Sequence, residues 1–281
     1  MSRGRAGRRR RAGLLLLCAF LLAAACGDPA RERYELAEKE LLAQRMETAL
    51  SGFRAVAREH PQSRYAPAAL LRQGDLFGAY FRNFPAALEA YGSLVFNYPR
   101  VAEVPLALLR SAEIHMLQFM DAAAAAGVLE RIRKEHPRFE RMDEALFLLA
   151  HARAAAGETD RQIAVLVELV ENHPRSTRAV EGRWALAYAY LGQRRYADAE
   201  REFRKLLFLA GDRRSAVRAR WGTAQSLEGR GDIPAAIEQY EALRNDWDDP
   251  GYIAGKIERL KARSGEPGRG REGGAGDRKP E

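Results

Sequence analysis

The chain has 281 residues, of which 47% are hydrophobic and 30% are charged, and its formal net charge is +8. This length is ample for a sizeable hydrophobic core. Six of the net positive charges are arginines within the first eleven residues. The remainder therefore carries only about +2, which gives no electrostatic case for a nucleic-acid partner.

The first 25 residues have the composition of an export signal. An arginine-rich start is followed by an apolar run from Leu14 to Leu22 and by small residues up to Cys26. The segment from Gly13 to Cys26 has 14 residues, whereas a helix needs about 20 to span a bilayer. A positive region, an apolar region and small residues in this order predict a signal peptide over residues 1–25.

The segment Leu22-Ala23-Ala24-Ala25-Cys26 resembles the lipobox of bacterial lipoproteins, although Ala23 stands where that family usually has leucine. The resemblance implies cleavage before Cys26, acyl chains such as palmitate on this cysteine, and a lipidated tether over residues 26–29. The alternative is an ordinary secretory peptide with a chance cysteine. Because Cys18 would be removed, no thiol would remain for a disulfide, a metal or catalysis. Gly27 resembles lipoproteins exported to the outer membrane, so we expect an anchor on its periplasmic face.

A repeat of 37–38 residues follows the tether. Four similar strings end in proline, at Pro61, Pro99, Pro137 and Pro174. Twelve residues before each proline, and again one and two repeats after the last of these positions, the residue is alanine in five of six cases. The six residues are Ala49, Ala87, Ala125, Gln162, Ala199 and Ala236. A large apolar residue follows one helical turn later: Phe53, Tyr91, Leu129, Leu166, Phe203 and Tyr240. This pairing is what close helix–helix packing needs.

A second series of small residues marks the preceding helix of each unit: Gly74, Ala112, Ala150, Ala187 and Ala224. In the first two of these units, the number of residues between the two markers is larger by one than in the other units, so we expect an extra linker residue there. We expect turns at Gly157, Gly192 and Gly231, and each proline after a second helix. The pattern predicts an all-α fold, a right-handed superhelical solenoid of about five to six helix pairs without a sheet.

The two ends differ from the repeats. Residues 30–46 predict a charged first helix that serves as a polar cap. A capping helix is expected over residues 251–263, with Ile253, Ile257 and Leu260 inside. The helical repeat domain is therefore predicted over residues 30–263. Residues 264–281 are rich in Gly, Pro and charge and predict a disordered tail.

The repeats resemble the tetratricopeptide repeat (TPR) family. The nearest match runs from Trp184 to Gly211 and includes Tyr196-Ala197-Asp198-Ala199 and Phe203. Gln162 departs from the family pattern, so packing is expected to be looser there. The longer period and the endings His60-Pro61-Gln62-Ser63 and His173-Pro174-Arg175-Ser176 resemble two envelope families. One is BamD of outer-membrane β-barrel assembly, and the other is CpoB of the Tol-Pal system.

Chemistry-bearing residues are sparse. His60, His136 and His173 occupy one repeat position before proline, which spaces them too widely to share a metal. His115 and His151 have no second ligand at helical spacing. No nucleotide or hydrolase motif occurs, so we expect no catalytic residue, metal or cofactor and a protein that is not an enzyme. An envelope hydrolase remains as a distant alternative.

The TPR resemblance implies a concave groove, lined by the first helices, that takes an extended peptide or a partner helix. The candidate groove residues are Phe147, His151, Trp184, Tyr188, Leu191, Trp221 and Gln225. Packing of Trp184 and Trp221 as ordinary core is the favoured alternative, because aromatics at helical spacing are usually core. The neighbouring helices are rich in arginine: Arg178, Arg183, Arg194, Arg195, Arg213, Arg214, Arg218 and Arg220. We expect most of these to form a solvated face, with an acidic partner segment as the alternative.

Together these resemblances imply a lipid-anchored, non-enzymatic scaffold of an envelope complex, similar in architecture to BamD. Its partners would be envelope proteins and, through the acyl chains, the membrane. A CpoB-like coordinator of Tol-Pal and peptidoglycan synthesis is the alternative. That family usually has a non-lipidated signal and an N-terminal coiled coil, and no sustained heptad precedes the repeats here.

Overall fold

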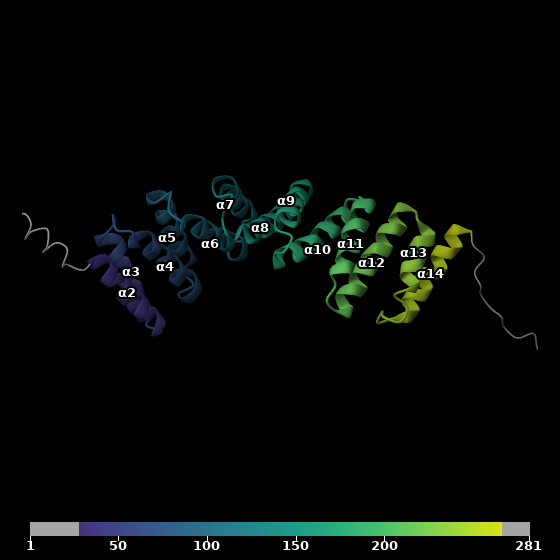
Figure 1. The fold of residues 1–281 in the computed structure, drawn as a ribbon, viewed down its shortest axis with the longest axis horizontal. Helices are drawn as coiled ribbons and strands as arrows, with labels where there is room; N and C mark the ends of the chain where they lie inside the picture. Colours follow the sequence, from purple (N-terminus) through teal and green to yellow (C-terminus); the bar gives the residue numbers. More distant parts are fainter. Residues whose placement is uncertain (1–27, 266–281) are drawn as a thin grey trace, which may run out of the picture. The chain divides into compact units, whose positions relative to one another are not determined.

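The computed structural model describes residues 28–265, which form thirteen α-helices and one π-helix (Figure 1). The predicted signal peptide, Cys26 and residues 266–281 of the predicted tail lie outside the described residues. Within residues 28–265 there is no strand. None of the described helices is both long and apolar enough to cross a membrane.

The helices follow one another in six pairs and a final single helix. The pairs are α2 (Pro29–Leu42) with α3 (Met46–Glu59), α4 (Tyr65–Asp75) and its extension η1 (Leu76–Tyr80) with α5 (Phe84–Asn97), α6 (Val104–Leu117) with α7 (Ala122–Glu135), α8 (Met142–Ala155) with α9 (Thr159–Asn172), α10 (Thr177–Gly192) with α11 (Tyr196–Leu209), and α12 (Arg213–Arg230) with α13 (Ile233–Glu241). The last helix, α14 (Pro250–Ser264), packs against α13. The predicted all-α fold of about five to six helix pairs is confirmed.

The chain divides into two compact units, residues 1–139 and residues 140–281. The described part of the first unit holds α2 to α7, and that of the second holds α8 to α14. Within each unit the second helix of one pair packs on the first helix of the next, as α3 does on α4 and α11 on α12. Each unit is therefore a stack of helix pairs.

The repeat markers form the core of both units. All five alanines of the first marker series are fully buried: Ala49, Ala87, Ala125, Ala199 and Ala236. The large residues one turn later are also buried: Phe53, Tyr91, Leu129, Leu166, Phe203 and Tyr240. Gln162, which breaks the series, is only partly buried. Burial of such side chains contributes about 1.5–3 kcal/mol each, so these markers account for much of the drive to stack helices.

Each second helix that precedes a repeat proline ends in the same way. The residues His60, Tyr98, His136 and His173 cap α3, α5, α7 and α9 with φ values between −125° and −131°. A following proline excludes the helical conformation from the residue before it and lacks an N–H to continue the helix. The carbonyl of His60 instead accepts the N–H of Ser63 at 2.9 Å, and His173 likewise accepts from Ser176 at 3.0 Å. The predicted proline turns are confirmed.

The turn inside each pair contains one residue with positive φ. These residues are Gln44, Arg82, Met120, Gly157, Arg194 and Gly231. The expectation of a turn at Gly192 is wrong, because Gly192 is the last residue of α10 and the left-handed residue is Arg194, with φ of 59°. The spacing of the two helices fixes the left-handed turn position. A residue with a side chain is tolerated there, at a modest conformational cost.

The extra residue expected in two repeats lies in a helix end in the first of them, but in the second it lies in the linker, where four residues separate α6 from α7 instead of three. After α4 the chain widens into η1, where the N–H of Asn83 donates to the carbonyl of Phe77, six residues earlier, at 2.8 Å. The N–H of Asp121 after α6 reaches back six residues to His115 in the same way. At the corresponding point after α10, Arg195 donates to Tyr190, five residues earlier. A widened helical turn absorbs an extra residue while its backbone groups stay hydrogen bonded.

Candidate binding face on the first helices of the second unit

The seven candidate groove residues lie on three first helices of the second unit. Phe147 and His151 are on α8, and the other five are divided between α10 and α12. Because α10 contacts both α8 and α12, these helices are neighbours in the stack. None of the seven is fully buried: Tyr188 and His151 are exposed, and the others are partly buried. We call this set of seven residues the first-helix face.

Trp184 and Tyr188 form one aromatic group on α10. Their rings stack with centroids 6.1 Å apart, and each also packs edge-on against the buried ring of Phe203 on α11. Phe203 thus packs against both rings from the core side. One side of each ring belongs to the core, while Tyr188 remains 36% exposed. Trp184 is therefore partly buried: it is neither a fully exposed groove residue nor a fully buried core residue.

Trp221 on α12 anchors a second aromatic group. Its ring stacks on Trp247 with centroids 4.5 Å apart and packs edge-on against the buried Tyr240 at 5.2 Å. Tyr252 of α14 lies 5.9 Å away from the same ring. The connection from α13 to α14 therefore folds back onto the first-helix face and completes a platform of Trp221, Trp247 and Tyr252.

The repeat pattern could not reveal this platform in full. Trp247 and Tyr252 lie beyond the last repeat marker, so no periodic signal connects them with Trp221. Trp247 also lines an adjoining cavity of about 590 Å³, together with Arg214 and Val217 of α12. The platform is thus continuous with a hollow large enough for a side chain.

Phe147 and His151 form a third, smaller group on α8. Their rings meet edge-on with centroids 4.5 Å apart. The guanidinium of Arg178 lies over the Phe147 ring at 5.2 Å and also pairs with Glu181 at 2.7 Å. The hydrogen bond that Arg178 donates to Glu181 raises the pKa of Arg178 and outweighs the burial that opposes it.

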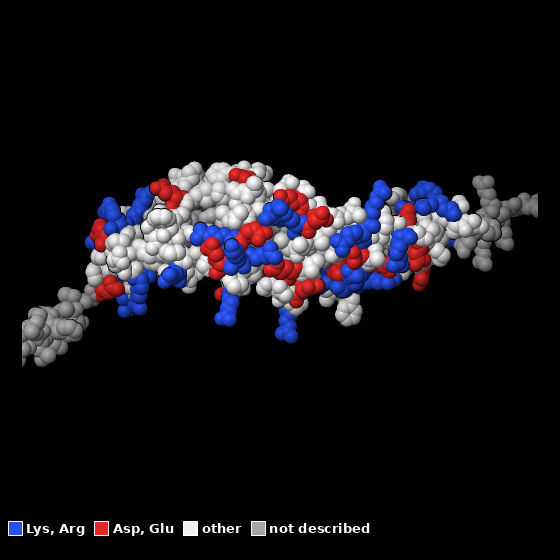
Figure 2. Space-filling view, turned by 90° about the horizontal axis from the view of Figure 1, so that it is seen from above, with Lys and Arg blue, Asp and Glu red and all other residues white. Residues whose placement is uncertain are grey.

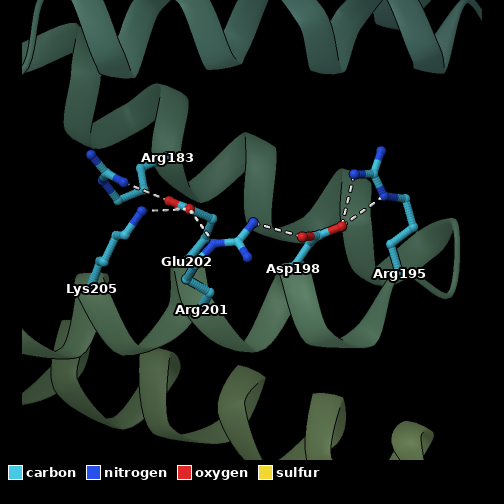
Figure 3. Close-up of polar contacts among 6 residues, drawn as sticks. All are labelled: Arg183, Arg195, Asp198, Arg201, Glu202 and Lys205. Atoms are coloured by element: carbon cyan, nitrogen blue, oxygen red, sulfur yellow. Dashed lines mark hydrogen bonds and ion pairs between the residues drawn. The ribbon is translucent and has the colours of Figure 1, made fainter.

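The buried carboxylate of Glu202 ties α10 to α11, and Asp198 lies beside it in the same polar network (Figure 3). Glu202 is 4% exposed and lies 2.5 Å from Arg183 of α10 and 2.8 Å from Lys205. Asp198 lies 2.7 Å from Arg195 and 2.6 Å from Arg201. Burial raises the pKa of Asp198, but the hydrogen bonds from the two arginines outweigh it and hold the pKa below its usual value. Arg183 precedes Trp184, so this network fixes the segment that carries the aromatic group.

The arginines of the second unit divide into paired and unpaired ones. Arg213 pairs with Asp246 at 2.6 Å, and the network above engages Arg183 and Arg195. On the face drawn in Figure 2, basic and acidic side chains likewise lie next to one another rather than in separate areas. Among the described residues, four of the eight arginines singled out above make no ion pair: Arg194, Arg214, Arg218 and Arg220.

Three of the five histidines cap helices: His60, His136 and His173 end the second helices of the first, third and fourth pairs. His115 lies on α6 beside Phe119, in the first unit, and lines a cavity of about 520 Å³. Within residues 28–265 no group of three His, Cys, Asp or Glu side chains is placed to hold a metal ion.

Comparison with known proteins identifies the repeat type. A tetratricopeptide-repeat family model matches residues 185–250, from α10 to the start of α14. Among solved structures, the chain is similar to a tetratricopeptide repeat protein from Parabacteroides merdae ATCC 43184, with a TM-score of 0.54 and 17% identity over 85% of this chain and 88% of that chain. No curated protein matches the sequence.

Two other solved structures share the arrangement. MamA from Desulfovibrio magneticus RS-1 gives a TM-score of 0.50 and 19% identity over 64% of this chain and 94% of that chain. A structure of Naa15/Naa10 bound to HypK-THB gives 0.53 and 12% identity over 84% of this chain and 39% of that chain. The chain thus has the all-α TPR fold, which typically presents a surface for binding other proteins and carries no catalytic machinery of its own.

Proposed function

We propose that the protein is a lipid-anchored, non-enzymatic scaffold on the periplasmic face of the bacterial outer membrane. It binds a segment of an envelope protein on the first-helix face of its second unit. The signal-like N-terminus and the lipobox-like residues before Cys26 support the anchor. Two or more acyl chains on one cysteine hold a protein at a membrane far better than a single chain does.

One observation carries the binding part of the proposal. The aromatic residues of the first-helix face are held rigidly by neighbouring rings, yet they keep part of their surface exposed. Large aromatic side chains that are ordered before binding are typical anchors of protein interfaces, because little side-chain entropy is lost when the partner arrives. Phe203 and Tyr240 provide this order from the core side.

Among envelope scaffolds, the long repeat and its His-Pro-x-Ser endings resemble both the BamD and the CpoB family, and the first candidate is a role like that of BamD in β-barrel assembly. A CpoB-like role in the Tol-Pal system is the second candidate. The lipobox-like segment favours the former, since the CpoB family usually lacks a lipidated cysteine. The two candidates predict different partners, and an experiment in cells can separate them.

The test is site-specific photo-crosslinking in the native host. A photoreactive residue is placed at Tyr188 on the first-helix face, and a matched probe replaces Ala197, an exposed residue of α11. We expect Tyr188, and not Ala197, to capture a subunit of the β-barrel assembly machine. Capture of Tol or Pal proteins instead would favour the CpoB-like role, and equal labelling from both positions would contradict binding on this face.

The anchor is tested separately by blocking lipoprotein maturation. Globomycin treatment should leave a longer precursor, and Cys26→Ala should release the protein from outer-membrane fractions. An unchanged precursor size in the presence of the inhibitor would contradict lipidation. Crosslinking from Tyr188 is informative in either case, because it depends on the partner and not on the acyl chains.

A further inference from the structure

Arg218 differs from the other arginines that lie over aromatic rings in the second unit. Arg178, over Phe147, is neutralised by Glu181, and Arg195, over the ring of Tyr190, is neutralised by Asp198. The Arg218 guanidinium lies 4.3 Å from the ring centroid of Trp184 and 5.0 Å from that of Tyr188. In the described part of the chain, no carboxylate lies within ion-pair distance of it.

The position of Arg218 is fixed despite the lack of an acidic partner. Its Nε–H donates to the Tyr188 hydroxyl at 2.9 Å, and its central guanidinium carbon lies over both rings. Attraction to a ring face needs none of the N–H donors on the terminal nitrogens. Of five N–H donors, the four on the terminal nitrogens therefore stay available for an acceptor.

A guanidinium held in this way is prepared for a carboxylate. The planar fork of arginine binds a carboxylate with two parallel hydrogen bonds, and fixing the fork in advance lowers the entropy lost on binding. A neutral acceptor gains less from the positive charge. The unpaired charge on the first-helix face thus selects an acidic group.

The neighbouring platform adds a second requirement. Trp221 lies three residues after Arg218 on α12, and side chains at this spacing are about 5–6 Å apart. In an extended peptide, alternate side chains point to one side and are separated by about 6.6 Å. A carboxylate on Arg218 would therefore place the side chain two residues away over Trp221 and Trp247.

We propose that the first-helix face binds an extended segment of the partner protein in which Asp or Glu lies two residues from a large apolar side chain. The carboxylate pairs with Arg218, and the apolar side chain packs on the platform of Trp221, Trp247 and Tyr252. This inference rests on the proposed function, because it names the chemistry of the partner segment that the scaffold binds.

Peptide selection tests this inference directly. The full chain, purified in detergent from its host, is used to select from a display library of random twelve-residue peptides. We expect enriched peptides to share an acidic residue two positions from a large apolar one. No enrichment, or enriched peptides without a carboxylate, would overturn the inference.

Variants then connect the carboxylate to Arg218. Arg218→Gln should weaken binding of a selected peptide by about tenfold or more. Replacing the acidic residue of the peptide with its amide should weaken binding to the unchanged protein by the same factor. The amide peptide should bind Arg218→Gln no more weakly than the acidic peptide does. Arg218→Lys, which keeps the charge but not the fork, should lose less. Retained binding by Arg218→Gln would overturn the inference.

Arg194→Gln is the matched control. It removes the same charge from another exposed, unpaired arginine of the unit. Glutamine is compatible with this turn, because Gln44 occupies the equivalent position with the same φ of 59°. We expect the control to bind like the unchanged protein. Equal weakening by both variants would show a general charge effect and overturn the assignment to Arg218.

The two proposals can fail separately. If Tyr188 crosslinks an envelope partner through a segment without a carboxylate, the scaffold function stands and the acidic specificity is wrong. If acidic peptides bind through Arg218 but no envelope protein is captured in cells, the specificity stands and the proposed function is wrong.

Discussion

The two units use one repeat plan and differ in how they depart from it. In the first unit, one extra residue is absorbed at the end of α4 and another in the linker after α6. The first helices of the second unit lack this residue, but the unit buries two carboxylates, Glu200 and Glu202, each 4% exposed. The small-large markers recur in both units, with Gln162 as the exception, whereas three of the four proline turns lie in the first unit and one in the second. Packing between the two helices of a repeat thus constrains where the helices lie, whereas the helix ends and the ion pairs vary between repeats.

The surfaces of the units differ as well. In the first unit α5 carries a single charged residue, Glu89, and α7 carries none over its first eight residues. In the second unit the equivalent helix α11 holds a dense set of ion pairs. On the first helix α12, Arg214 and Arg220 are, like Arg218, unpaired among the described residues. Arg218 differs from these two in lying over the rings of Trp184 and Tyr188.

Deleting one residue gives the strongest test of this comparison. Removal of Gly78 from η1 should restore ordinary helical spacing and shift stability by only about 1 kcal/mol. Removal of Ala189 from α10, which has no extra residue, should cost more than about 4 kcal/mol, because it rotates Tyr190 and the following turn off their packing positions. Denaturant midpoints followed by helical circular dichroism measure both changes. Equal losses would show that the widened turn is needed in its own right.

Breaking one ion pair in each unit tests the difference in burial. Arg183→Met should destabilise the second unit by about 3 kcal/mol, because it removes a buried partner of Glu202. Arg72→Met removes the cation that faces Glu38 in the first unit, where both side chains are more exposed, and should cost less than about 1 kcal/mol. Chemical denaturation of the two variants compares them. A loss for Arg72→Met as large as that for Arg183→Met would contradict the contrast.

The turns inside the pairs should respond alike in both units. Gln44→Gly in the first unit and Arg194→Gly in the second each relieve a left-handed side chain and should stabilise by about 1 kcal/mol. The reverse change, Gly157→Arg, should destabilise by a similar amount. Thermal unfolding midpoints provide the measurement. A gain in only one unit would show that the turns are not equivalent.

The smallest expected effect is the contribution of Asp198, in the second unit's network, to the pH dependence of stability. The pKa of Asp198 is lower in the folded protein than in the unfolded chain, where it is about 3.9. Its stabilising contribution is therefore fully present above that value and is lost as pH falls through the folded pKa. Thermal midpoints between pH 6 and pH 2 should fall less steeply in Asp198→Asn than in the unchanged protein. Parallel curves would contradict the role of this carboxylate.

Sequence by itself determined the repeat and most of its consequences. The small-large markers, four proline turns and helices at both ends could be predicted because each depends on residues close together in the chain. The placement of a turn at Gly192 was wrong, because glycine is favoured in a left-handed position but is not confined to it. The extra residue was detected by spacing, and the linker between α6 and α7 contains it as expected. Its place in the widened helix end η1 after α4 was not predicted, since hydrogen bonding decides where it is absorbed.

Only the tertiary structure decided what the first-helix face presents. Trp184 and Trp221 were recognisable as repeat aromatics, but their position between core and surface depends on Phe203, Tyr240 and Trp247. Arg218 was one of eight arginines in the sequence, and only contacts across α10 and α12 distinguish it from the paired ones. The physical reason is range: a helix and its turns follow from local spacing, whereas the partner of a charge or a ring is set by helices about one repeat apart in the chain.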